Sequence, residues 1–263
     1  MIIQKRHRIA KKVADEFRKR LLHTHAELLV YPLKYMNLQV ALCEHFGIIV
    51  DEIENLAIRK IRTKLFSLGL HLPAEPFDDY LELAGFLYAS DGTVIIFIEK
   101  NDIEERKKFS LAHETAHFLN EYFKLKAQRT NHTTLPLFEE KTSESHVVIA
   151  KRCTKNDVFG MLFGKKEPDF HVKNEKVSIE SLLAYKQKRQ DTLREKICDW
   201  FAAELLMPVD IVRQLESKWM AEGLTLDQMI NGIQESFEVS FFAAQVRADE
   251  LQLGQTSQDY LIG

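Results

Sequence analysis

The segment His113-Glu114-Thr115-Ala116-His117 constrains this 263-residue chain more than any other feature of its sequence. Histidines four residues apart lie one turn apart on one side of an α-helix, so both imidazoles can reach a single ion. The small residues Ala112 and Ala116 beside them suit close packing rather than exposure to solvent. The segment therefore predicts a packed helix that carries two ligands of a zinc ion.

The glutamate between the two histidines supplies the chemistry. Glu114 lies one residue further round the helix than His113, so its carboxylate can reach a water molecule on the metal rather than the metal itself. Zinc lowers the pKa of such a water, and a nearby carboxylate can accept its proton and hand it to a leaving amine. The pattern H-E-x-x-H thus predicts hydrolysis of a peptide bond, with Glu114 as the general base.

A catalytic zinc usually has three protein ligands and a water, so two histidines are not sufficient. The extended metzincin pattern would need glycine at position 120 and histidine at position 123. This chain has Asn120 and Phe123 there, which excludes that class. The third ligand must therefore come from another part of the chain.

A second predicted helix, at about residues 191–207, offers carboxylates for this purpose. Glu195 and Asp199 lie one turn apart on one face, and Asp199 could orient a ligand histidine through its other ring nitrogen. Glu204 is nine residues from Glu195, about half a turn away, so the two cannot both face the metal. Glu195 is the preferred third ligand, and Glu204, His132 and His146 remain as alternatives.

The remaining sequence predicts an α+β fold with a small mixed sheet. Two β-branched and aromatic runs, Leu83–Ala89 and Thr93–Glu99, are joined by Ser90-Asp91-Gly92, which favours a hairpin. A helix follows, with Asn101 and Glu104 spaced as in a capping box. The other predicted helices cover about residues 5–30, 33–46, 52–68 and 191–207, and the second of them ends at Gly47. The other predicted strands cover residues 48–50 and 145–153.

The predicted domain organisation separates residues 1–208, which hold the H-E-x-x-H helix, from a C-terminal helical segment at 209–263. Two loops, at about 70–79 and 124–144, and an insertion at about 154–190 fall inside the first part. Two or three short helices are expected after Pro208, and residues 237–247 faintly resemble a helix-turn-helix. Their acidic balance favours a structural role over contact with phosphates.

Composition limits which cellular compartment and which classes of ligand we expect for this chain. The three cysteines, at 43, 153 and 198, are far apart, which argues against a disulfide framework and favours a reducing cytoplasm. The sequence has neither a secretory signal pattern nor an apolar run long enough to cross a bilayer. The net charge is −3, so nucleic acid is not expected as the main ligand, and the basic cluster in residues 1–30 is interpreted as a solvated helix.

Two segments resemble one known family, the ImmA/IrrE-type metallo-endopeptidases. Residues 108–118, Lys-Phe-Ser-Leu-Ala-His-Glu-Thr-Ala-His-Phe, resemble the family's "rFtlaHElgH" segment, and residues 198–208 resemble its "AnxFAaeLLMP" segment. The resemblance covers about residues 20–210. It implies a zincin-like fold and a zinc-dependent peptidase of the bacterial cytoplasm, whose substrate is a helix-turn-helix repressor.

Carried over by motif, the resemblance makes His113 and His117 ligands, Glu114 the base and Glu195 the glutamate ligand. Cys198-Asp199 departs from the usual alanine-asparagine, and the gap between the motifs is longer than in compact members. Two other functions are weighed beside the endopeptidase: a zinc-containing regulatory or DNA- or protein-binding module without turnover, and a zinc hydrolase of small peptides. Neither the substrate nor the oligomeric state follows from the sequence.

Overall fold

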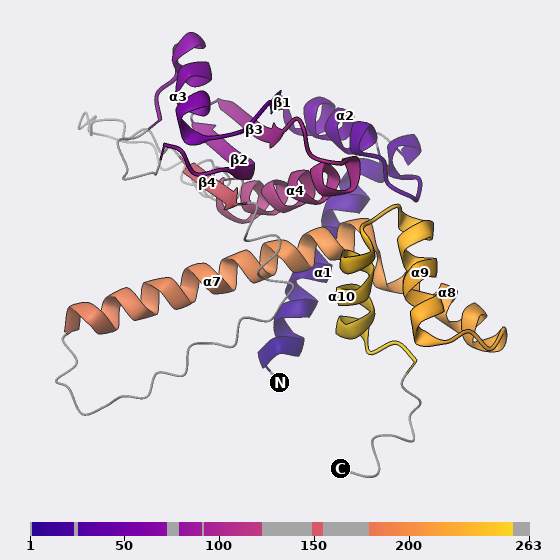
Figure 1. Cartoon of the computed structure of the whole chain (residues 1–263). Helices are drawn as coiled ribbons and strands as arrows, with labels where there is room; N and C mark the ends of the chain where they lie inside the picture. Colours follow the sequence, from indigo (N-terminus) through magenta and orange to yellow (C-terminus); the bar gives the residue numbers. More distant parts are fainter. Residues whose placement is uncertain are drawn as a thin grey trace, which may run out of the picture. The chain divides into compact units, whose positions relative to one another are not determined.

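The computed structural model describes residues 2–23, 26–72, 79–90, 92–122, 149–154 and 179–254. The chain divides into two compact units, Arg20–Lys155 and Met1–Lys19 together with Asn156–Gly263. The first contains a mixed sheet and the second is helical where it is described (Figure 1). This is the predicted α+β fold, with a small mixed sheet packed on the H-E-x-x-H helix, while the proposed domain boundary at residue 208 stays a prediction.

The unit Arg20–Lys155 holds all four described strands. Its elements are η1 (Ala26–Leu29), α2 (Tyr35–Phe46), β1 (Ile48–Ile53), α3 (Ile58–Ser67), β2 (Leu83–Ser90), β3 (Thr93–Glu99), α4 (Glu104–His117), the π-helical turn η2 (Phe118–Tyr122) and β4 (Ile149–Thr154). The sheet order is β1-β3-β2-β4, with β1 parallel to β3 and β2 antiparallel to both of its neighbours. The predicted hairpin is confirmed, with Ser90 paired to Thr93 across its turn.

The two faces of the sheet bury different helices. Phe86 and Tyr88 of β2 and Phe97 of β3 pack with α3 in one apolar cluster. Because side chains alternate along a strand, the intervening residues, including Gly85 and Leu87, lie on the opposite face. That face contacts α4, which touches β2, β3 and β4. The sheet is therefore the platform that fixes the position of the H-E-x-x-H helix.

The predicted helix at 52–68 begins six residues later than expected. Glu52 and Ile53 belong to β1, which stays paired with β3 as far as Ile53 and Glu99. The buried carboxylate of Glu99 then accepts hydrogen bonds from the backbone N–H groups of Asn55 and Leu56, at 3.0 and 2.6 Å. These two bonds hold the turn after β1, so α3 starts only at Ile58.

The predicted capping box before α4 is wrong. The residue before the first turn is Ile103, with an extended backbone and no side-chain cap, and not Asn101. Glu104 and Glu105 in the first turn provide negative charge near the helix N-terminus instead. In contrast, α2 ends as predicted at Gly47, whose left-handed φ of 66° lets its N–H reach the carbonyls of Leu42 and Cys43.

The second unit contains α1 up to residue 19, α7 (Ile179–Leu206), α8 (Val209–Ala221), α9 (Leu226–Phe237) and α10 (Phe241–Leu251). The full α1 helix covers Ile2–Leu22, so it is shorter than the predicted helix at 5–30. Its buried face includes Ala10, Ala14 and Phe17, whereas Ile9 is exposed. The Phe17 ring meets Phe201 of α7 edge-on, with centroids 5.9 Å apart.

The helix α7 begins at Ile179 rather than near residue 191, so residues 179–190 belong to the helix and not to the predicted insertion. Residues 155–178 of that insertion, most of the predicted loops and the first residues of the strand expected at 145–153 lie outside the described ranges. After Pro208 the described chain forms three helices, α8, α9 and α10, which confirms the prediction of two or three short helices there. In the part of the chain that is described, no helix has the length and apolar character needed to cross a membrane.

Candidate metal centre

The helix α4 is buried along most of its length, including its polar residues. His113 and His117 are each 1% exposed and Glu114 is fully buried. The helix contacts α2, and the Phe46 ring of α2 meets Phe118 just after α4, with centroids 5.8 Å apart. Burying two imidazoles and a carboxylate on one turn costs free energy unless they are engaged, so the arrangement indicates a functional site.

The two imidazoles of α4 point to one place. The Nε2 atoms of His113 and His117 are 3.1 Å apart, and their rings are inclined at 64°. Two nitrogens bound to one tetrahedral zinc at the usual bond length of ~2.0–2.1 Å would be about 3.3 Å apart. The observed separation therefore fits two ligands of one zinc ion, and nitrogen from neutral imidazole is a donor that zinc prefers.

The side chain of Glu114 packs against the sheet. Its carboxylate lies over Gly85 of β2, so close that a Cβ atom added there would be 3.0 Å from Glu114 Oε1. The base predicted from the sequence is thus held between its own helix and one strand. This neighbour was not among the site residues predicted from the sequence, because strand pairing and helix packing bring positions 85 and 114 together.

Polar and charged groups from α2, β1 and α4 meet beside the N-terminal half of α4. Lys107 Nζ forms an ion pair with Glu52 Oε2 at 2.7 Å, and it lies 6.0 Å from the centre of the Tyr35 ring. Burial, followed by the negative charge of Glu52, raises the pKa of the Tyr35 hydroxyl, which therefore stays protonated at neutral pH. This cluster holds the N-terminal half of α4 against β1 and α2. The histidine pair lies in the C-terminal half of the helix.

The predicted third ligand lies on α7, in the other unit. Glu195 and Asp199 are both half-buried, one turn apart, and the residues that follow them, from Phe201 to Met207, are buried. The role of Glu195 as a ligand of the same ion stays a prediction. The same holds for Asp199 as its supporting partner.

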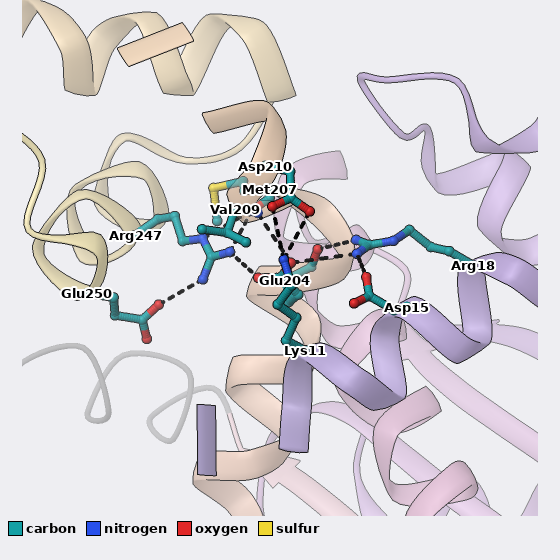
Figure 2. Close-up of polar contacts among 9 residues, drawn as sticks. All are labelled: Lys11, Asp15, Arg18, Glu204, Met207, Val209, Asp210, Arg247 and Glu250. Carbon is teal, nitrogen blue, oxygen red and sulfur yellow. Dashed lines mark hydrogen bonds and ion pairs between the residues drawn. The ribbon is translucent and has the colours of Figure 1, made fainter. Parts of the chain in front are cut away.

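Glu204, the main competitor for the third position, is committed elsewhere. Figure 2 shows its carboxylate between Arg18 of α1 and Arg247 of α10, and Arg247 Nη2 donates a hydrogen bond to Glu204 Oε2. The other oxygen accepts from the backbone N–H of Val209 at 3.2 Å and lies 3.6 Å from Arg18 Nη2. A carboxylate whose charge is balanced by two guanidinium groups has a structural role. This argues against Glu204 as a metal ligand. The other two alternatives, His132 and His146, lie outside the described residues.

Arg247 is a second residue whose role was not predicted. It is 1% exposed, and its Nε and Nη2 atoms donate to the carbonyl oxygen of Met207 at 3.0 and 2.8 Å. The one arginine of α10 is thus turned inward, and the exposed positions of that helix are Phe241, Gln245 and Asp249. This supports the structural interpretation of the C-terminal helices, because α10 offers no exposed cation for a phosphate.

A comparison with known families agrees with the resemblance seen in the sequence. Residues 66–142 match the family model described as Peptidase_M78: IrrE N-terminal-like domain. The matched range includes β2, β3 and α4, and therefore both histidines and Glu114, but it does not reach α7. No curated protein matches the chain. The match supports a peptidase, and the donor set on α4 is that of a possible metal site.

Proposed function

Because the chain belongs to the ImmA/IrrE family, we propose that it is a zinc-dependent endopeptidase in which Glu114 is the general base. The observation that carries the proposal is the buried pair of Nε2 atoms, 3.1 Å apart, on the helix that also carries Glu114. A pair of imidazoles alone would suit many metal proteins. Their combination with a neighbouring carboxylate, inside a segment that matches a peptidase family, favours hydrolysis.

In this proposal His113 and His117 are two of the zinc ligands and Glu195 is the third. Three observations support Glu195: its residue type, its half-buried position on α7, and the engagement of the competing Glu204 with Arg18 and Arg247. Asp199 would accept a hydrogen bond from the second ring nitrogen of a ligand histidine, which fixes the tautomer and the ring orientation.

Zinc held by these side chains would supply a Lewis acid that polarises the scissile carbonyl and lowers the pKa of the attacking water to about 7. Glu114 accepts the proton of that water at its carboxylate as the water attacks the carbonyl carbon. The same carboxyl group then gives the proton to the amine of the leaving peptide. The buried surroundings of α4 exclude bulk water and strengthen these electrostatic interactions.

We further propose a protein substrate, and more narrowly a helix-turn-helix repressor, in a cytoplasmic setting. This proposal is supported by the resemblance of residues 108–118 and 198–208 to segments of the family. It does not rest on a feature of the described surface. A repressor encoded beside this chain is the first substrate to test. Cleavage of short peptides at many sites would instead point to a hydrolase of small peptides.

The test compares two glutamates of the same helix, Glu114 and the exposed Glu104. Glu114→Gln should retain one zinc per chain, measured by metal analysis, and should cleave at least about a hundredfold more slowly, since general base catalysis contributes about 10²–10⁴ in rate. Glu104→Gln should match the wild type in both measurements. Equal cleavage by Glu114→Gln, or a purified protein without stoichiometric zinc, would contradict the proposed function.

A further inference from the structure

The glycine of β2 lies directly beneath the proposed base. Gly85 occupies a buried position on the sheet face that packs against α4, paired with Ile98 on one side and Cys153 on the other. The three atoms nearest to a Cβ built on Gly85 all belong to the Glu114 side chain: Oε1 at 3.0 Å, Cγ at 3.1 Å and Cδ at 3.5 Å. The absence of a side chain at 85 is therefore matched to one neighbour rather than to the helix in general.

The backbone does not require glycine at this position. Among the described residues, the glycines with positive φ are 47, 69, 92, 223 and 254, and Gly85 is not one of them. A glycine within a strand usually weakens it, because it packs no side chain and loses more conformational entropy on folding. Glycine in a strand is otherwise typical of a site where another group approaches closely. In this strand the approaching group is the carboxylate of Glu114.

From this contact we propose that Gly85 is a positioning residue that sets the location of the Glu114 carboxylate in the active site. Its missing side chain lets the carboxylate settle against β2, and a methyl group there would push the carboxylate away from the strand. The inference rests on the proposed function for its catalytic consequence. Its steric part concerns only two residues of one unit.

The variant Gly85→Ala tests the proposal with a small structural change, the addition of one methyl group. The new contacts of 3.0 and 3.1 Å would be relieved by moving the flexible end of Glu114 by a few tenths of an ångström, so the protein should fold. A displacement of 1 Å can cost about a hundredfold in rate, so this smaller shift should lower kcat by about tenfold. KM and the zinc content should stay unchanged, because no zinc ligand and no substrate contact is altered.

Ile95→Val is the matched control, since it also changes one methyl group in the sheet. Ile95 is buried in the apolar cluster that packs with α3, on the face of the sheet opposite to Gly85. It should lower Tm and leave kcat unchanged. Gly85→Ala should show the reverse pattern, with kcat lowered and Tm equal to that of the wild type or higher.

Crystal structures of the zinc-loaded wild type and Gly85→Ala provide a readout that does not depend on activity. A displaced Glu114 carboxylate supports the steric part, and an unmoved carboxylate overturns the proposal. Full kcat in Gly85→Ala, or loss of zinc from it, also overturns the proposal. If the wild type itself cleaves no protein or peptide, the proposed function fails, while the two structures still decide whether Gly85 positions Glu114.

Discussion

The guanidinium group of Arg247 is buried against the carboxylate of Glu204, joining α10 to the C-terminal end of α7 (Figure 2). Arg247 also donates two hydrogen bonds to the carbonyl oxygen of Met207, the residue that follows α7. Positive charge at the C-terminus of a helix is stabilising, and burial strengthens the effect. The C-terminal helices thus act as a clamp on the helix that carries Glu195.

Replacing Arg247 with methionine should destabilise the protein strongly. The change keeps much of the apolar volume but leaves Glu204 buried with one cation fewer and the carbonyl of Met207 without its two donors. Removing one partner of a buried pair costs about 3–5 kcal/mol, which urea denaturation can measure. Lys218→Ala, which removes an exposed pair with Glu222, is the control and should cost less than about 0.5 kcal/mol. A loss for Arg247→Met as small as that of the control would contradict the clamp.

The two carboxylates of α7 should separate stability from metal binding. Glu195→Gln should lower zinc affinity by at least about tenfold while the protein stays folded, because a neutral amide is a weak zinc donor. Glu204→Gln should show the opposite behaviour, with zinc retained and Tm lowered, because its carboxylate balances Arg18 and Arg247. Competition with a chelator measures the first effect, and thermal unfolding measures the second. Zinc loss from Glu204→Gln alone would reverse the assignment of the third ligand.

Glu250 should make stability depend on pH. Burial raises the pKa of this carboxyl group, outweighing the opposing effect of Arg247, and the negative charges of Asp199 and Glu204 raise it further. A raised pKa in the folded state favours folding at pH values below the unfolded pKa of about 4, and this contribution is lost as pH rises through the folded pKa. The stability of the wild type relative to Glu250→Gln should therefore fall as pH increases above about 4. Chemical denaturation at several pH values measures the difference, and a constant difference would count against it.

Gly232 of α9 should resist replacement although it lies within a helix. Alanine is favoured over glycine there by up to about 1 kcal/mol, but its Cβ would lie 2.6 Å from Cζ2 of the buried Trp219 ring. Overpacking typically costs about 1–3 kcal/mol, so Gly232→Ala should be destabilising overall. In a Trp219→Leu background the same change should become neutral or stabilising. Additive effects in this double-mutant cycle would show that the ring does not cause the penalty.

Local patterns in the sequence predicted the elements that depend on few neighbours. The H-E-x-x-H spacing, the hairpin at Ser90–Thr93 and the helix end at Gly47 each follow from the conformations of a few adjacent residues. The errors fell where distant residues decide. The helix expected from Glu52 lost its first turn to pairing with β3, and Asn101 did not become the cap of α4.

The sequence by itself determined the chemistry: two imidazoles one helical turn apart, a carboxylate between them, and the resemblance to a peptidase family. Tertiary structure decided which side chains support that chemistry. It brought Gly85 under Glu114, and it engaged Glu204 with Arg247, a residue 43 positions further along the chain. The physical reason is the separation along the chain between the residues that interact. Spacing along one helix fixes which residues share a face, whereas contacts between strands and helices depend on how the whole chain packs its apolar surface.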